Sequence, residues 1–152
     1  MNTYEINRNT IALIYENNKT IVYEKDNIFE INKFPNEIIK YSCEYFGCSF
    51  KGRIEGTKYL TGITHKSPII IEESDEIIFF PLSSPRQFNC SWIRSKYIKN
   101  YYKNKNCNKC VIELCNDKKI ELNCSYETIN NQILRSSRLE SIIRYRKNVN
   151  YV

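Results

Sequence analysis

The sequence has few of the features on which catalytic and membrane-spanning proteins depend. It holds one histidine, four glycines and four prolines in 152 residues. Its longest apolar runs, Pro68–Ile71 and Ile77–Phe80, are far shorter than the roughly 20 residues that cross a bilayer. The first ten residues show no basic stretch followed by an apolar one, so we expect no secretory signal. We therefore expect one soluble, cytoplasmic domain over residues 1–152 with its own core.

Catalytic motifs are also missing. His65 has no neighbouring nucleophile, and the sequence contains neither a phosphate-binding glycine loop nor a nucleophile elbow. The acidic cluster at residues 72–76 is typical of a solvated turn rather than of a Mg²⁺ site. We expect neither an enzyme nor a bound cofactor.

The cysteines point away from disulfides. There are seven, an odd count, and without a signal peptide reduced thiols are expected. Cys107 and Cys110 form a CxxC motif, and Cys115 and Cys124 follow, so four thiolates are available for a zinc site. The spacing from Cys115 to Cys124 is not that of a zinc knuckle. We therefore expect small buried hydrophobic residues and no metal.

Positive charge is concentrated in two blocks. The formal net charge is +6. Residues 77–112 hold seven Lys and Arg with no Asp or Glu, and residues 132–152 hold five with one acidic residue. Because the rest of the chain is slightly acidic, this asymmetry favours a polyanionic partner. Four aromatic residues that could stack on unpaired bases lie within the first block: Trp92, Tyr97, Tyr101 and Tyr102.

The first half of the chain predicts short strands and then a helix. β-branched and aromatic residues between turn residues predict strands at 4–6, 10–15, 20–24 and 28–31. Pro35 suits a first helical turn and Gly47 a C-cap, so a helix is expected at 35–46. Three glycines between residues 47 and 67 predict a loop or a bent hairpin there.

The second half predicts hairpins and a longer helix. Hairpin strands are expected in four ranges: 69–72, 76–80, 110–115 and 120–124. Between them lies a loop at 81–85. Residues 92–103 fit a helix or a strand, and their β-branched and aromatic residues favour the strand. Ser125 is a suitable N-cap for a helix at 126–146. The predicted fold class is α+β, with a mostly antiparallel sheet.

An ordered series of motifs runs through the middle of the chain. In one-letter form they are SC-x-x-FG from Ser42, GR-x-x-GT from Gly52, I-x-HK-x-PI from Ile63, FP-x-x-S-x-R from Phe80 and C-x-W-I from Cys90. Together they resemble the ComK family of competence transcription factors over roughly residues 4–140. The resemblance implies an activator of DNA-uptake genes that binds paired AT-rich boxes as an oligomer, through the minor groove.

Given this resemblance, we expect the basic residues to contact DNA. A narrow A·T minor groove is strongly negative and attracts inserted basic side chains. We expect loops carrying Arg53, His65, Lys66 and Arg86 to reach the groove, with Lys51 and Lys58 also contacting DNA. Phosphate contacts are expected from the basic strand: Arg94, Lys96, Lys99 and Lys103.

The chain departs from the family pattern in two places. The family does not place cysteines at positions 107, 110, 115 and 124, which further disfavours zinc. The chain also ends soon after the last helix, whereas longer members continue into a tail thought to be recognised by a Clp-protease adaptor. We expect that tail to be absent here, so whether a Clp-protease adaptor binds this chain is left open. Two alternatives remain: a single-stranded DNA or RNA binder, and a regulator that acts through protein–protein contacts.

Overall fold

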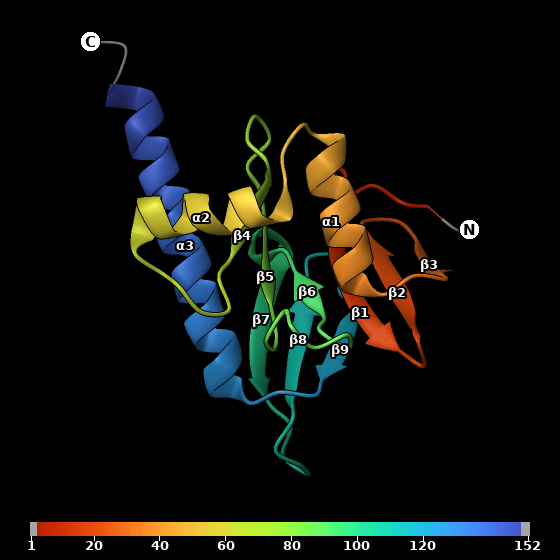
Figure 1. The fold of residues 1–152 in the computed structure, drawn as a ribbon. Helices are drawn as coiled ribbons and strands as arrows, with labels where there is room; N and C mark the ends of the chain where they lie inside the picture. The colour runs from red at the N-terminus through yellow and green to blue at the C-terminus, as the bar shows by residue number, and fades with distance from the viewer. Residues whose placement is uncertain (1–2, 150–152) are drawn as a thin grey trace.

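A six-stranded antiparallel sheet forms the centre of the fold in the computed structural model, which describes residues 3–149 (Figure 1). The strands lie in the order β3-β2-β1-β6-β5-β4. Their bounds are Thr10–Glu16 for β1, Lys19–Glu24 for β2, Ile28–Ile31 for β3, Ile69–Glu72 for β4, Ile77–Pro81 for β5 and Trp92–Ile93 for β6. Every pairing is antiparallel, as expected for an α+β chain with hairpin connections.

A smaller sheet and three helices cover the two faces of this sheet (Figure 1). The smaller sheet has the order β7-β8-β9, with β7 at Ile98–Lys103, β8 at Cys110–Leu114 and β9 at Lys119–Leu122. Helix α1 spans Pro35–Tyr45, α2 spans Phe50–Thr61 and α3 spans Tyr126–Val149. Helices α1 and α2 pack on one face, while the smaller sheet and the start of α3 pack on the other.

The continuous apolar runs of β4 and β5 are explained by burial on both faces. In β5, Phe79 packs in the cluster that includes α1, whereas Phe80 packs in the cluster that includes the smaller sheet. Ile78 of β5 and Ile70 of β4 contact Leu139 of α3. A strand with two buried faces has no need for polar alternation, so its sequence is apolar throughout.

Most of the predicted elements are confirmed. The early helix ends one residue before its predicted end, and α3 extends three residues beyond the predicted position 146. One predicted strand is wrong: residues 4–6 form no strand, and the Ile6 N–H instead donates to Ser42 Oγ of α1 at 2.9 Å. The predicted α+β class with mostly antiparallel strands is confirmed, and the strands form two sheets rather than one.

The loop predicted for residues 47–67 is wrong over most of its length, because α2 occupies Phe50–Thr61. Ser49 caps the helix by accepting the Gly52 N–H at 2.9 Å, and Gly62 ends it with φ of +80°. Two glycines inside a helix cost about 1 kcal/mol each relative to alanine. Packing of Phe50 and Ile54 against the core offsets that cost.

The strand predicted for residues 92–103 is interrupted. β6 and β7 are separated by a 3₁₀ turn at Ser95–Tyr97, which carries the chain from the large sheet to the small one. Arg94 precedes the turn, and its N–H donates to the Ile11 carbonyl at 2.9 Å. Arg94 and Lys96 therefore do not continue the exposed face of β7. Among the described residues, no helix is long and apolar enough to span a membrane.

Candidate nucleic-acid interface

Two loops lie side by side at one end of the large sheet. The 62–68 loop leads into β4, and the 82–91 loop leaves β5. Gln132 of α3, only 2% exposed, joins them at their bases. Its Nε2 donates to the Lys66 carbonyl at 2.9 Å and to the Pro81 carbonyl at 2.7 Å. One buried amide therefore fixes both loops to the same helix.

The backbone of the 62–68 loop is held from two sides. Thr57 Oγ1 of α2 donates to the Pro68 carbonyl at 2.6 Å. From α3, the Arg135 guanidinium donates to the carbonyls of His65 and Lys66. Lys66 adopts a φ of +48°, a left-handed conformation that such anchoring helps to maintain. Because the carbonyls face the protein, the side chains of His65 and Lys66 remain exposed.

The 82–91 loop is held by Asn36 in the first turn of α1. Asn36 Nδ2 donates to the carbonyls of Pro85 at 2.9 Å and Gln87 at 3.0 Å. Its Oδ1 accepts the indole N–H of buried Trp92 at 2.8 Å. The loop also closes on itself, since the Gln87 N–H donates to the Ser84 carbonyl at 3.0 Å. The loop therefore has a defined shape without any bound partner.

Four consecutive exposed side chains project from this loop: Arg86, Gln87, Phe88 and Asn89. Sequence reasoning identified only Arg86. A signal for the other three was present, because an Arg-Gln-Phe-Asn run directly after Pro85 combines a cation, two amides and an aromatic ring. Arg, Gln and Asn side chains are among those that contact phosphates in protein–DNA complexes.

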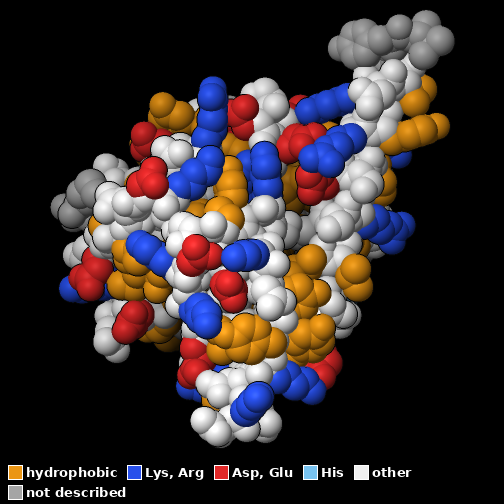
Figure 2. Space-filling model, turned by 180° about the vertical axis from the view of Figure 1, so that it is seen from behind, with side chains coloured by type: hydrophobic (Ala, Val, Ile, Leu, Met, Phe, Trp, Pro, Cys, Tyr) orange, Lys and Arg blue, Asp and Glu red, His pale blue; other side chains and the backbone are white. Residues whose placement is uncertain are grey.

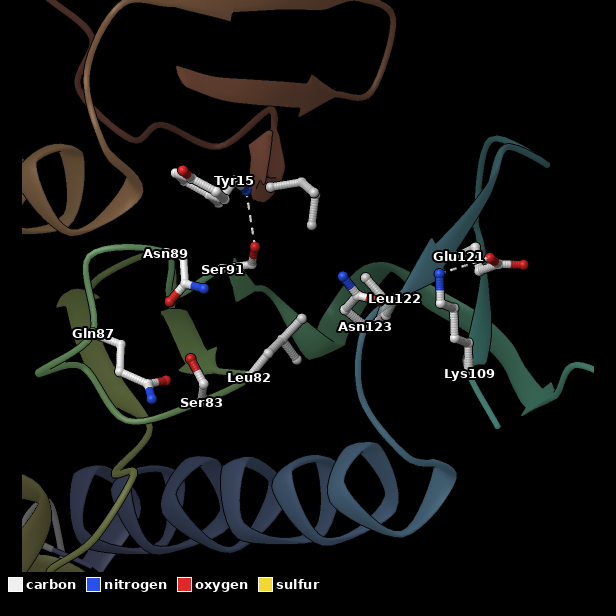
Figure 3. A pocket seen from close by; sticks show the side chains of 11 residues that line it. Tyr15, Leu82, Ser83, Gln87, Asn89, Ser91, Lys109, Glu121, Leu122 and Asn123 are labelled. Atoms are coloured by element: carbon white, nitrogen blue, oxygen red, sulfur yellow. Dashed lines mark hydrogen bonds and ion pairs between the residues drawn. The ribbon is translucent and has the colours of Figure 1, made fainter. Parts of the chain in front are cut away.

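A polar cavity of about 410 Å³ opens beside the 82–91 loop (Figure 3). Its walls come from the end of β1, the loop and the strand β9 with the residues that follow it. Ser83, Gln87, Asn89, Ser91 and Asn123 give it a lining rich in hydroxyl and amide groups. Ser91 Oγ also accepts the Tyr15 N–H at 2.9 Å and so joins the loop to β1. The cavity extends the hydrogen-bonding surface of the loop toward the small sheet.

Two of the predicted DNA contacts do not lie on an exposed loop or an exposed strand face. Arg53 lies in α2 rather than in a loop, and its side chain is 16% exposed and pairs with Glu73 at 3.3 Å. Arg94 is 2% exposed and donates to the carbonyls of Arg8 and Asp75, both at 3.2 Å. Burial away from water lowers the pKa of Arg94. Arg94 is thus part of the interior and not of a phosphate-binding face.

The remaining cations of the basic strand are separated from one another. Lys96 is exposed in the 3₁₀ turn. Lys99 pairs with Asp117 at 3.1 Å and with Glu113 at 3.7 Å, and Lys103 pairs with Glu127 at 3.2 Å. Figure 2, which views the small sheet, shows blue and red side chains interleaved on this face. The strand is therefore a mixed surface that neighbouring carboxylates largely neutralise.

The basic residues near the loops have no such partners within the part of the chain that the structure describes. Lys51 and Lys58 lie exposed on α2, and His65, Lys66 and Arg86 lie exposed on the loops. None of these side chains forms an ion pair with a described residue. Lys58 is in the last turn of α2, directly before Gly62 opens the 62–68 loop. The two loops therefore carry three basic side chains without an ion pair to a described residue, those of His65, Lys66 and Arg86.

Three of the four aromatic residues of the basic stretch make contacts within the protein. Trp92 is fully buried. Tyr97 packs against Lys25 and Arg94, and Tyr101 stacks on Tyr126 at a centroid distance of 5.3 Å. Stacking of bases on Tyr97 or Tyr101 would replace some of these contacts, whereas Tyr102 is exposed.

The cysteines form no metal site in the described residues, among which no group of three or more His, Cys, Asp or Glu side chains is placed to hold an ion. Cys107 and Cys115 are exposed, whereas Cys110 is buried. Burial raises the pKa of the Cys43 thiol to about 11 and that of Cys124 to about 12. Both thiols are therefore protonated at neutral pH and act as apolar side chains.

Comparison with known proteins gives one family and one curated relative. A family model described as ComK protein matches residues 1–148. The competence transcription factor of Bacillus subtilis (strain 168) is 34% identical over 145 residues, which cover 93% of this chain and 75% of that protein. No solved structure matches.

Proposed function

This chain belongs to the ComK family, and we propose that it is a transcriptional regulator of competence that binds AT-rich double-stranded DNA through the minor groove. The observation that carries the proposal is the pair of anchored loops with free positive charge at one end of the large sheet. A transcription factor of this family requires no catalytic group. We propose that it acts in the cytoplasm as a homo-oligomer on DNA, with a Clp-protease adaptor as a candidate partner.

The chemistry of the loops suits an A·T minor groove. That groove is narrow and strongly negative, and basic side chains insert into it. Its floor carries only the acceptors adenine N3 and thymine O2, to which amide N–H groups donate. Arg86 supplies the charge, while Gln87 and Asn89 supply amides on the same loop. Because the loop is already ordered, little conformational entropy is lost on binding.

The described contacts divide the basic residues into three groups. We assign groove contacts to Arg86, His65 and Lys66, because these project freely from the loops. We assign phosphate contacts to Lys51, Lys58 and Lys96, with Lys99 and Lys103 able to exchange a carboxylate for a phosphate. Arg53 and Arg94 receive structural roles. Phosphate contacts add affinity without sequence preference, whereas groove contacts carry the preference for A·T pairs.

This division predicts different results for Arg86→Ala and Lys58→Ala. Arg86→Ala should reduce affinity for an A·T-box duplex about tenfold and for a G·C duplex much less, since each groove contact contributes about 1–3 kcal/mol of discrimination. Lys58→Ala should weaken both duplexes equally and lower the salt dependence of binding by about one counterion. Fluorescence anisotropy at several salt concentrations measures both effects.

Three outcomes would argue against the assignment or against the proposed function. An equal loss on both duplexes for Arg86→Ala would make Arg86 a phosphate contact. Tighter binding to single strands than to any duplex would favour the single-stranded or RNA-binding alternative, and absence of binding to all nucleic acids would favour a regulator that acts through protein contacts.

A further inference from the structure

Phe88 places a large apolar ring among the polar side chains of the 82–91 loop. The residue is 58% exposed, and Gln87 and Asn89 on either side of it are exposed as well. A phenyl ring in water gains nothing from this exposure, because its burial would release about 25 cal/mol per Å² of apolar surface. Phe88 differs from the other exposed apolar residues by its place in the middle of the candidate DNA-contacting loop, where a bound duplex would cover it.

The Phe88 ring packs against two other aromatic rings, and the backbone on both sides of it is held by hydrogen bonds. Tyr15 packs edge-on against it at a centroid distance of 5.7 Å and an interplanar angle of 77°, and Phe34 lies at 5.6 Å. The backbone on its N-terminal side is fixed by Asn36, which donates to the Gln87 carbonyl. On its C-terminal side, the Cys90 N–H closes back onto the same carbonyl at 3.2 Å. The ring therefore has a defined position, with one side against Tyr15 and Phe34 and more than half of the residue exposed.

We propose that Phe88 is a wedge that inserts between two adjacent base pairs from the minor groove and bends the duplex. The proposal rests on the function proposed above and adds a mechanical step to it. Minor-groove proteins insert apolar side chains between base steps, which partly unstacks the step and kinks DNA by about 20–90°. An AT-rich box that contains a TA step suits this insertion, because TA steps are easily kinked or unstacked.

The neighbours of Phe88 match the needs of a wedge. Insertion requires that the adjacent backbone approach the groove closely and that nearby groups replace water at the base edges. Arg86, Gln87 and Asn89 are placed on the same short turn to do both. Tyr15 and Phe34 restrict rotation of the Phe88 side chain, so little side-chain entropy is lost when the ring is inserted.

The test uses the full chain and an AT-box duplex with a donor and an acceptor dye at its two ends. At saturating wild-type protein, energy transfer should rise because the ends approach each other. Phe88→Ala should remove most of that rise and weaken binding about tenfold, whereas Phe88→Leu, which keeps an apolar wedge, should retain at least half of it. 2-Aminopurine placed at successive steps should brighten at one step with the wild type and at none with Phe88→Ala.

Tyr45→Ala is the matched control. Tyr45 is 59% exposed, like Phe88, but lies at the opposite end of α1 from Asn36. This variant should bend DNA as the wild type does. Wild-type binding without bending, or full bending by Phe88→Ala, would overturn the wedge and leave the AT-box function intact. Failure of the wild type to bind the duplex at all would overturn the proposed function together with the wedge. Thermal melting confirms that each variant is folded.

Discussion

Replacing Asn36 with alanine is expected to weaken binding to an AT-box duplex about 100-fold, although Asn36 lies on α1 and outside both loops. Its side chain holds the carbonyls of Pro85 and Gln87 and the indole of Trp92. Without it, residues 85–87 become free to move, and ordering a backbone residue costs about 1 kcal/mol. Three such residues account for about 3 kcal/mol, or about 100-fold in affinity.

Asn36→Ala must be compared with an equivalent change elsewhere. Asn9→Ala suits this purpose, because Asn9 is exposed beside the start of β1 and its side chain forms no hydrogen bond with a described residue. Anisotropy titrations well below the melting temperature should show wild-type affinity for Asn9→Ala. If Asn36→Ala binds as tightly as the wild type while remaining folded, the shape of the 82–91 loop is unimportant for DNA binding.

Replacing Arg94 with methionine is expected to lower the free energy of unfolding by about 3 kcal/mol without changing how DNA affinity depends on salt. The guanidinium donates to two carbonyls inside the protein, those of Arg8 and Asp75. A buried acceptor that loses its donor costs about 1–3 kcal/mol. Since Arg94 contacts no solvent, it releases no counterion when DNA binds.

Lys96→Met is the control for Arg94→Met, because it removes the same charge from an exposed side chain two residues away. Its free energy of unfolding should change by less than about 0.5 kcal/mol. It should nevertheless weaken binding to all duplexes and lower the salt dependence by about one counterion. Urea unfolding and salt titrations separate the two effects. A stable Arg94→Met variant with a reduced salt dependence would return Arg94 to the phosphate-binding surface.

Local patterns predicted most of the fold. Alternation, turn residues and capping signals located the hairpins, α1 and α3, because these depend on residues close together in sequence. Helix α2 was missed because Gly52 and Gly56 indicated a loop, although Ser49 and Gly62 marked its two ends. The two caps were stronger signals than the glycine content. A cap satisfies backbone groups at the end of a helix, whereas a glycine inside the helix only lowers its stability.

The candidate site was predictable only in part. Charge and motif order identified His65, Lys66 and Arg86, all of which are exposed on the two loops. The anchors of those loops could not be predicted, because Gln132 and Arg135 contact carbonyls more than 50 residues away in sequence. The burial of Arg94 likewise depends on contacts with the N-terminal segment and the β4–β5 turn, which no local pattern encodes.

Binding to three duplexes of equal length tests the central claim most directly. One carries A·T boxes, one the same boxes with I·C pairs and one G·C boxes. Inosine lacks the 2-amino group, so an I·C pair resembles A·T in the minor groove and differs from it in the major groove. We expect the I·C duplex to bind about as tightly as A·T and the G·C duplex to bind at least tenfold more weakly. Equal affinity for all three, or tight binding to A·T alone, would contradict recognition through the minor groove.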